Sequence, residues 1–255
     1  EGTDRVNELM QWGTAFDTKT TKEFDLVREG GHSENRILHY KDHSGSEIQR
    51  ALINKIKAID TIEYLENHIL VDLITDHHTK TEHKHCYGAY IISTLDQEII
   101  TIASKLTILT TGGVGQLYEF TTNPRVATGD GLGAAYRAKV QIKNLPYIQF
   151  HPTALYLKVN GDTFLITEAV RGSGGVLRNL DGERFMSNYD NRKELAPRDI
   201  VSRAIAQELL SRKESHVLLD ATAIKKDEFL SHFPMIHETC ISIGIDPMKE
   251  GIPVV

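Results

Sequence analysis

Reactive polar side chains gather in three clusters between residues 149 and 203, within a stretch that is otherwise rich in apolar residues. The clusters supply an imidazole, two hydroxyls, a carboxylate and two guanidinium groups: His151 and Thr153, then Thr167, Glu168 and Arg171, and finally Arg198. Such groups are costly to bury unless they bond to one another or to a ligand. The fold is therefore expected to bring these segments together, around a small dianionic acid that undergoes proton transfer.

Arg198 is the residue of this set that is hardest to explain as ordinary structure. It lies in the first turn of a helix predicted over residues 197–211, with Pro197 at its start. The positive end of the helix dipole opposes a cation there by a few tenths to about 1 kcal/mol, whereas the same helix start favours an anion. A salt-bridged surface arginine is the alternative. We favour a functional role, because Glu168 and Arg171, predicted on a strand and a loop, can meet Arg198.

The bulk properties are those of an ordinary soluble globular chain. Its 255 residues leave room for one large domain or two modest ones, with 40% hydrophobic and 25% charged residues. The formal charge of −6 argues against binding to nucleic acid, and the lack of a long apolar run argues against a membrane-spanning segment. Cys86 and Cys240 are far apart, so buried reduced thiols and a cytoplasmic location are expected. We interpret His68, His77, His78, His83 and His85 as solvated loop residues and expect no metal site.

Glycine-containing loops are further candidates for ligand contact. Residues 28–33 place two adjacent glycines among charged and hydrogen-bonding residues, which indicates a tight backbone aimed at a site, although spacing alone favours a surface turn. The β-branched run from Lys105 to Thr111 predicts a buried strand that ends in Gly112–Gly113, where α/β sheets bind ligands. Asp130, before a helix predicted over 131–139, is a helix cap, a ligand contact or both. The signal is weak, because nothing matches the pattern GxGxxG.

The remaining periodicity predicts an α/β chain. Helices are predicted over 4–13, 48–59 and within 225–243, and strands over 69–73, 87–93, 98–103, 163–169, 176–178, 184–186 and 217–220. Composition changes after Pro146, so we place a domain boundary near residue 145. A helical-looking start and an apolar, strand-like end are interpreted as those of an internal piece of a longer protein.

Five motifs follow one another along most of the chain. They are REGGHS at 28–33, TTGG-x-GQLY-x-x-TTNP-x-x-ATGDG at 110–131, QFHPTAL at 149–155, FLITEA-x-RG at 164–172 and ELAPRDIV-x-RAI at 194–205. Together they closely resemble the L-aspartate oxidase branch of the succinate dehydrogenase and fumarate reductase flavoprotein family. Several of the motifs are long enough to make a chance resemblance improbable.

The resemblance implies a fold and a reaction. Residues 1–145 would form part of an FAD-binding Rossmann-like α/β domain, and residues 146–255 a fumarate-reductase-type α+β capping domain. L-aspartate would lose hydride to FAD and become iminoaspartate, and dioxygen or fumarate would reoxidise the flavin. Iminoaspartate feeds quinolinate and then NAD synthesis, so quinolinate synthase is an expected downstream partner.

The resemblance also implies substrate-binding residues. His151 and Thr167 match the family's binders of the substrate carboxylates, and Gln149 is expected to line the same pocket. Glu29 matches the glutamate that faces the substrate amino group in the aspartate oxidases. A third carboxylate beside two substrate carboxylates is repulsive unless an ammonium intervenes. Glu29 therefore predicts aspartate as the substrate, in preference to succinate.

Catalytic and cofactor-binding roles follow from the same resemblance. Arg198 matches the arginine that transfers the proton in fumarate reductases and that binds the substrate in the oxidase. Glu168 and Arg171 match the family's proton relay to that arginine. Because a free arginine is a poor acid, the proton role needs a shared hydrogen-bonded network. The residues expected near FAD are Thr111, Gly112, Gly113 and Asp130.

The sequence departs from the family pattern in three places. Residue 173 is Ser, where the family usually has Glu in RGEG. The chain contains neither the N-terminal fingerprint for the FAD pyrophosphate nor the family's segments beyond position 255, so alone it is expected neither to hold FAD tightly nor to turn over. Two alternatives are a flavoprotein subunit of succinate dehydrogenase or fumarate reductase, and a non-catalytic piece whose polar clusters only support packing.

Overall fold

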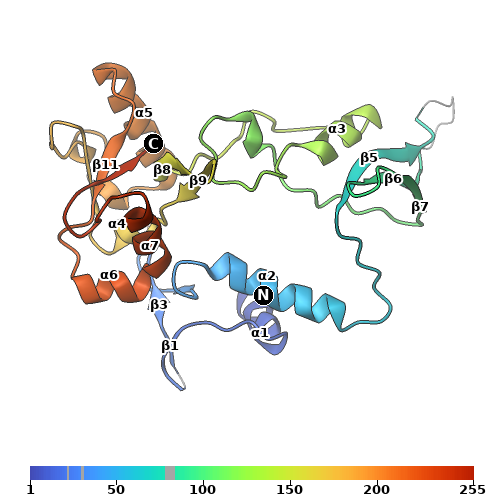
Figure 1. Cartoon of the computed structure of the whole chain (residues 1–255), viewed down its shortest axis with the longest axis horizontal. Coiled ribbons are helices and arrows are strands. Elements are labelled where there is room, and N and C mark those ends of the chain that lie inside the picture. The colour runs from blue at the N-terminus through green and yellow to red at the C-terminus, as the bar shows by residue number, and fades with distance from the viewer. Residues whose placement is uncertain (22, 30–31, 78–83) are drawn as a thin grey trace. The chain divides into compact units, whose positions relative to one another are not determined.

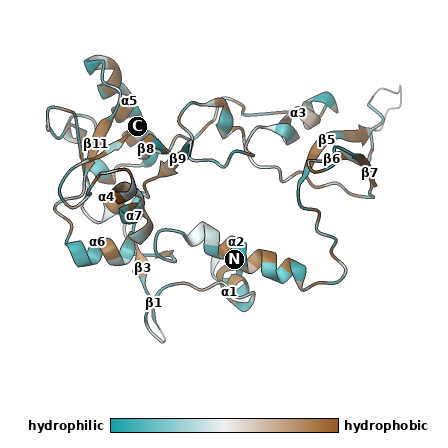
Figure 2. Cartoon of the chain, in the orientation of Figure 1, coloured by the Kyte–Doolittle hydropathy of each residue, from teal (hydrophilic) through white to brown (hydrophobic). Residues whose placement is uncertain are grey.

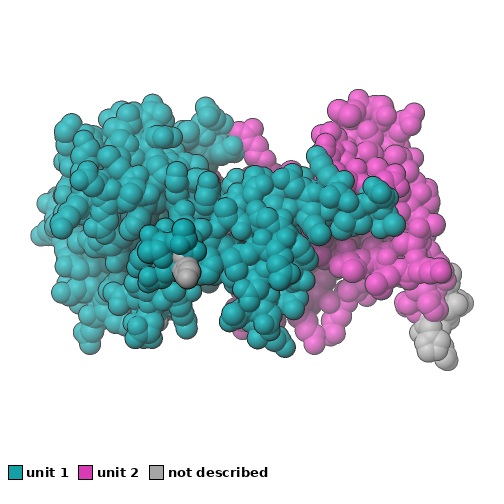
Figure 3. Space-filling model, turned by 90° about the horizontal axis from the view of Figure 1, so that it is seen from below, with its two compact units in different colours: residues 1–62, 149–255 teal, residues 63–148 magenta. Residues whose placement is uncertain are grey.

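The computed structural model describes residues 1–21, 23–29, 32–77 and 84–255 (Figure 1). It divides into two compact units: unit 1 comprises Glu1–Ile62 and Gln149–Val255, and unit 2 comprises Glu63–Ile148 (Figure 3). The predicted turn at Gly30 and Gly31, and two of the clustered histidines, His78 and His83, lie outside the described residues. These two units are defined by packing within the chain. The boundary predicted near residue 145 divides the chain by function, into a cofactor-binding part and a cap, and it stays a prediction.

An antiparallel five-stranded sheet forms the centre of unit 1, in the order β10–β11–β12–β8–β9. The strands are β8 (Ala154–Val159), β9 (Asp162–Leu165), β10 (Val176–Arg178), β11 (Val217–Asp220) and β12 (Ile252–Val254). Val217 and Leu219 on β11 are completely buried and alternate with less buried neighbours, as a strand covered on one face requires. The core of unit 1 therefore lies against one face of this sheet.

Helices supply the rest of this core. They are α4 (Ala169–Gly172), α5 (Arg198–Arg212), α6 (Lys226–His232) and α7 (Pro234–Ser242), with short 3₁₀ helices η2 (Met186–Asn188) and η3 (Lys193–Leu195) between them. Helix α5 buries Val201, Ala204 and Ile205, whose spacing puts them on one side of the helix. Phe229 on α6 and Ile236 on α7 join the same cluster, and full burial of side chains of this size contributes about 1.5–3 kcal/mol each.

In the N-terminal part of unit 1, the described residues form two helices and two small hairpins. The elements are α1 (Gly2–Gln11), β1 (Thr18–Thr20) paired with β2 (Glu23–Phe24), β3 (Leu26–Val27) paired with β4 (Ile37–Leu38), and α2 (Ser44–Lys57). Glu47 on α2 is buried and accepts from the Ala15 amide at 2.7 Å and from Arg50 Nε at 2.8 Å. These bonds hold the chain after α1 against α2.

The described residues of unit 2 form an antiparallel meander and the helix α3. Its elements are β5 (His68–Thr75), β6 (Cys86–Ser93), β7 (Ile99–Ala103), the 3₁₀ helix η1 (Gly115–Leu117) and α3 (Asp130–Arg137). Figure 2 shows hydrophobic residues along these strands. Arg137 Nε lies 2.9 Å from Asp72 Oδ2 and joins α3 to β5.

Most predicted helices and strands are confirmed, but four local predictions are wrong. His68, interpreted as a loop residue, is the first residue of strand β5. Residues 105–111 form no strand: the regular structure ends at Ala103, and Leu106 and Ile108 are exposed, because no described strand runs beside them. The strand predicted over 163–169 ends at Leu165. The strand predicted over 184–186 is reduced to a single bridge between Arg178 and Arg184.

Across the part of the chain that the structure describes, no helix is both long and apolar enough to span a bilayer.

Candidate active site

The start of helix α5 places Arg198 beside three other segments of unit 1. Arg198 Nη2 lies 2.8 Å from Glu168 Oε2 and 3.6 Å from Glu29 Oε2. Arg198 Nη1 donates to Gln149 Oε1 at 3.4 Å. The extended Pro197 makes the helix begin at Arg198, so the guanidinium projects from the first turn. Four segments far apart in sequence thus meet at one cation.

Glu168 and Arg171 form a buried ion pair next to Arg198. The strand predicted to carry Glu168 ends earlier, so Glu168 precedes the short helix α4 and Arg171 lies within it, one turn away. Arg171 Nη2 lies 3.2 Å from Glu168 Oε1, and Arg171 Nη1 donates to the Glu194 carbonyl at 2.5 Å. Burial lowers the pKa of Arg171, and Arg198 adds to this lowering, while Glu168 opposes it. Glu168 therefore holds one buried and one half-exposed guanidinium at once.

Among the described residues, part of the hydrogen-bonding capacity of this pair is unused. Glu168 Oε2 and Arg171 Nε and Nη2 are buried, and no described residue partners them in hydrogen-bond geometry. The ion-pair distances show attraction, yet the angles fall short of hydrogen bonds. Buried polar atoms without partners are uncommon in folded proteins. Donors and acceptors left over beside Arg198 are what a site for a polar ligand requires.

His151 is held neutral, with one ring nitrogen left to donate. The Thr153 amide donates to His151 Nδ1 at 3.2 Å, so in the neutral ring the proton is on Nε2. Burial lowers the pKa of His151 to about 4, and the positive charges of Arg171 and Arg198 add to the lowering. A neutral imidazole that donates through Nε2 can bind a carboxylate oxygen without itself giving up a proton.

This lowered pKa predicts how stability depends on pH. In the unfolded chain a histidine has a pKa of about 6.5, whereas in the folded protein the pKa of His151 is lowered to about 4. Between these two pKa values the unfolded state binds a proton that the folded state does not bind. The contribution of His151 to the free energy of unfolding is therefore fully present above the pKa of the unfolded state and is lost as pH falls toward 4. We expect the melting temperature of the wild type to fall more steeply than that of His151→Gln between pH 7 and 4.5. Parallel melting curves would show that His151 is not held neutral.

The two threonines of the site have different surroundings. The fully buried Thr153 donates its hydroxyl to the Ile166 carbonyl at 2.8 Å, which joins β8 to the end of β9 and indicates a structural role. Thr167 Oγ1 accepts weakly from the Ala169 amide at 3.4 Å and lines a cavity of about 700 Å³. Glu29 and Ser173 line the same cavity. Thr167 and Glu29 therefore both face this cavity, whose lining among the described residues does not include Arg198, His151 or Gln149.

Sequence reasoning missed Glu194, which supports Arg171 from the other side. Its side chain is buried, pairs with Arg184 and accepts from the Leu177 amide at 3.2 Å. Its carbonyl receives the bond from Arg171. The available signal was a carboxylate at the head of the motif ELAPRD, and its partners could not be read from spacing.

The residues expected near a cofactor lie together in unit 2. A Cβ at Gly131 would lie 1.9 Å from Thr111 Oγ1, so the loop at 111 touches the start of α3, where Asp130 stands. Gly112 has φ +76°, a conformation that glycine favours, and a Cβ at Gly112 or Gly113 would meet nothing within 4 Å. Open backbone beside a helix start with an adjacent carboxylate fits close approach by a nucleotide cofactor. Among the described residues, no group of three His, Cys, Asp or Glu could hold a metal ion.

Comparison with known proteins places the chain among flavoproteins. The family model described as "FAD binding domain" matches residues 1–255. The chain is 45% identical over 262 residues to L-aspartate oxidase 2-b, chloroplastic, of Nicotiana tabacum, covering all of this chain and 40% of that protein. It is 41% identical over 255 residues to L-aspartate oxidase of Yersinia pestis, covering 98% of this chain and 48% of that one. The chain therefore spans less than half the length of these curated relatives.

Solved structures agree on the fold. A quinol-fumarate reductase with menaquinol molecules has a TM-score of 0.84 at 28% identity, covering 98% of this chain and 45% of that chain. Mycobacterium smegmatis Sdh1 in complex with UQ1 has a TM-score of 0.71 at 29% identity, covering 100% and 44%. The predicted fold class, a mixed α/β chain of the fumarate reductase type, is confirmed.

Proposed function

This chain belongs to the FAD-binding-domain family, and from that premise we propose that it is part of an FAD-dependent oxidoreductase that oxidises L-aspartate to iminoaspartate. The observation that carries the proposal is the meeting of Glu29, Gln149 and Glu168 at Arg198. Identity of 40–45% to several L-aspartate oxidases supports the choice of substrate.

The geometry supports separate binding roles for the side chains around a dicarboxylate that carries an amine. Arg198 binds one carboxylate in bidentate fashion, which its planar guanidinium permits. His151 Nε2–H and Thr167 donate to carboxylate oxygens, and Gln149 orients Arg198. Glu29 accepts a hydrogen bond from the substrate ammonium. Its attraction to that ammonium offsets the repulsion between Glu29 and the two substrate carboxylates.

The buried pair supplies the environment for the proton. Glu168 forms ion pairs with both Arg171 and Arg198, and the donors and acceptors that these pairs leave unused would join the ligand in the network that lets a guanidinium take part in proton transfer. FAD, when bound, would supply the acceptor for the hydride. The residues of unit 2 that would hold it are Thr111, Gly112, Gly113 and Asp130. Exclusion of water by the cap strengthens the pairs between arginine and carboxylate.

Further elements of the proposal rest on the resemblance. Dioxygen or fumarate would reoxidise the flavin, the product would enter quinolinate and NAD synthesis with quinolinate synthase as the next enzyme, and the location would be cytoplasmic. Residues 1–145 would belong to the FAD domain and residues 146–255 to the cap. The 255 residues alone would be inactive. The alternative is a flavoprotein subunit of succinate dehydrogenase or fumarate reductase, favoured by the solved structures that share this fold.

Substitution of Glu29 separates the two functions. In the full-length, FAD-loaded protein we expect Glu29→Gln to lower kcat/KM for L-aspartate by about 10- to 100-fold, because one charge-assisted hydrogen bond to the ammonium is lost. Anaerobic flavin bleaching in a stopped-flow instrument measures this. The exposed Glu34 of the same segment provides the control Glu34→Gln, which should leave the rate unchanged. Wild-type reduction by succinate at a rate comparable to that by aspartate would favour the alternative enzyme.

A further inference from the structure

Glu29 stands at the tip of a short arm, which we define as the described residues of 17–44. Strands β3 and β4 pair in the register Leu26↔Leu38. Asp25 immediately precedes β3 and His39 immediately follows β4, so these two residues share one end of the arm. Glu29 lies four residues beyond Asp25, or about 13 Å at the rise of an extended chain. The arm thus has a base at Asp25 and His39, and a tip at Glu29.

Hydrogen bonds make the base of the arm a connected piece. The Asp17 amide donates to the His39 carbonyl at 2.8 Å, and the Asp25 amide donates to the Asp17 carbonyl at 2.9 Å. Asp17 Oδ2 accepts from the Lys41 amide at 2.5 Å and lies 3.2 Å from His39 Nδ1. Backbone and side-chain bonds therefore tie three passes of the chain together at this end.

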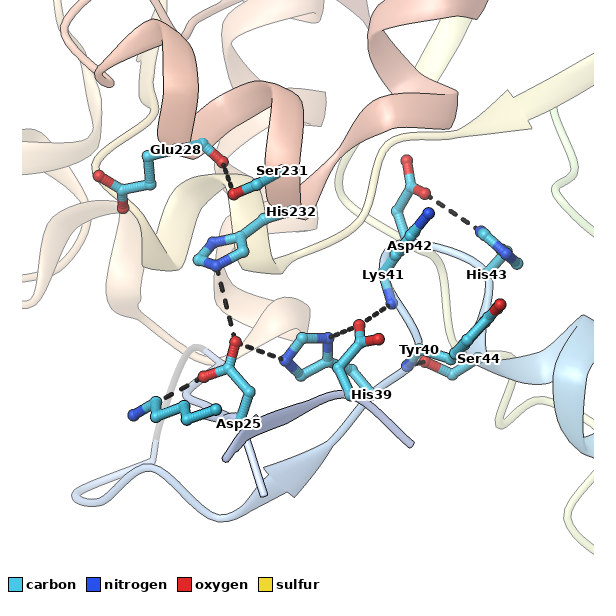
Figure 4. Close-up of polar contacts among 12 residues, drawn as sticks. Asp25, His39, Tyr40, Lys41, Asp42, His43, Ser44, Glu228, Ser231 and His232 are labelled. Carbon is cyan, nitrogen blue, oxygen red and sulfur yellow. Dashed lines mark hydrogen bonds and ion pairs between the residues drawn. The ribbon is translucent and has the colours of Figure 1, made fainter. Parts of the chain in front are cut away.

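Two aspartates of the base approach the C-terminal helices of unit 1. Asp25 Oδ2 lies 3.8 Å from His232 Nε2 at the end of α6 and 3.7 Å from His39 Nε2, between the two rings, and both contacts are electrostatic because these distances exceed that of a hydrogen bond (Figure 4). Asp42 Oδ2 accepts from the Ile236 amide at 2.9 Å, in the first turn of α7, where amides need acceptors. Lys19 Nζ is 3.7 Å from Asp25 Oδ1, but this lysine is largely exposed and the pair is therefore weak.

The tip of the arm meets the candidate site. A Cβ at Gly172 would lie 2.6 Å from the Arg28 carbonyl oxygen, so the arm packs tightly on α4, directly after the Glu168–Arg171 pair. One residue further, Glu29 reaches Arg198. A shift of the base relative to α6 would therefore move Glu29 relative to Arg198, because the two-residue strands between them are short.

We propose that Asp25 and His232 are positioning residues, which fasten the arm to α6 and thereby set where the Glu29 carboxylate stands. The inference rests on the proposed function: an arm held in place keeps Glu29 at the ammonium of an amino dicarboxylate, whereas a loosened arm loses this contact and leaves the carboxylate-binding residues intact. Selectivity for the amine thus depends on a contact outside the site.

The test compares two ligands in the full-length, FAD-loaded protein. The variants are Asp25→Asn and His232→Gln, which break the same pair from opposite sides, and the control is Asp227→Asn, which removes an exposed charge from the same helix. Dissociation constants for L-aspartate under anaerobic conditions, from the concentration dependence of flavin reduction, are compared with those for succinate, from perturbation of the flavin spectrum. We expect aspartate to bind about 3- to 10-fold more weakly in both variants, because a misplaced contact loses part of its energy, and succinate to change less than about 2-fold.

A double-mutant cycle distinguishes positioning from general damage. In a Glu29→Gln background, Asp25→Asn should have no further effect on aspartate binding, since the residue through which it acts is already gone. Equal weakening of both ligands, or additive effects with Glu29→Gln, would overturn the inference in favour of a merely structural pair. If one variant fails to fold, the other carries the test. A wild type that does not prefer aspartate would refute the proposed function, whereas variants that prefer aspartate as strongly as the wild type would refute only the positioning role.

Discussion

Arg198→Lys in the full-length, FAD-loaded protein should lower kcat for L-aspartate by about 10²- to 10³-fold. Lysine keeps the positive charge but cannot bind a carboxylate in bidentate fashion. It also cannot contact Glu168, Glu29 and Gln149 together, as Nη1 and Nη2 of the arginine do. Steady-state turnover with aspartate, together with flavin reduction in a single turnover, measures the loss at the chemical step.

The same substitution should leave the fold intact. Arg198 has a side chain that is 37% exposed, and lysine retains an ion pair with Glu168, so the melting temperature should stay close to that of the wild type. Arg203→Lys on the same helix, where the exposed arginine pairs with Asp199, is the matched control and should change neither quantity. A non-catalytic role for the polar clusters predicts the reverse pattern, in which Arg198→Leu lowers the melting temperature while turnover per folded molecule is retained.

Part of the site could be found from the sequence because one of its residues departs from the usual charge preference at a helix start. A cation at a helix start opposes the helix dipole, and this conflict singled out Arg198, which the structure places beside Glu168 and Glu29. The identity of Glu29 came from resemblance, since spacing alone favoured a surface turn. Apolar periodicity found most helices and strands, because a buried face leaves a repeat in the sequence.

What the sequence could not reveal depends on partners far away along the chain. The run from Lys105 to Thr111 has the composition of a buried strand, yet a strand also needs a neighbour, and no described strand runs beside it. Asp42 and the Ile236 amide bond across 194 residues, and no local pattern announces such a contact. Glu194 was missed for the same reason, because its partners lie on three separate segments.

The buried pair predicts the largest effect on stability in the chain. Arg171→Met should lower the free energy of unfolding by about 3–5 kcal/mol, because Glu168 keeps its burial and loses its fully enclosed partner. The Glu194 carbonyl also loses its donor. Chemical denaturation of the full-length protein, followed by tryptophan fluorescence and by circular dichroism, measures the change.

The chain offers both a control and a rescue for this prediction. Arg192→Met removes an exposed arginine that pairs with Asp190 and should cost no more than about 1 kcal/mol. The double variant Glu168→Leu with Arg171→Met should recover much of the stability lost in Arg171→Met, because no buried carboxylate is then left with only the half-exposed Arg198 as its partner. It should nevertheless be inactive, since Arg198 then lacks its acidic neighbour at 2.8 Å. If Arg171→Met lowered the free energy of unfolding as little as Arg192→Met, water would have to satisfy the unpaired donors and acceptors beside Arg198. The buried pair would then not be what holds the site together.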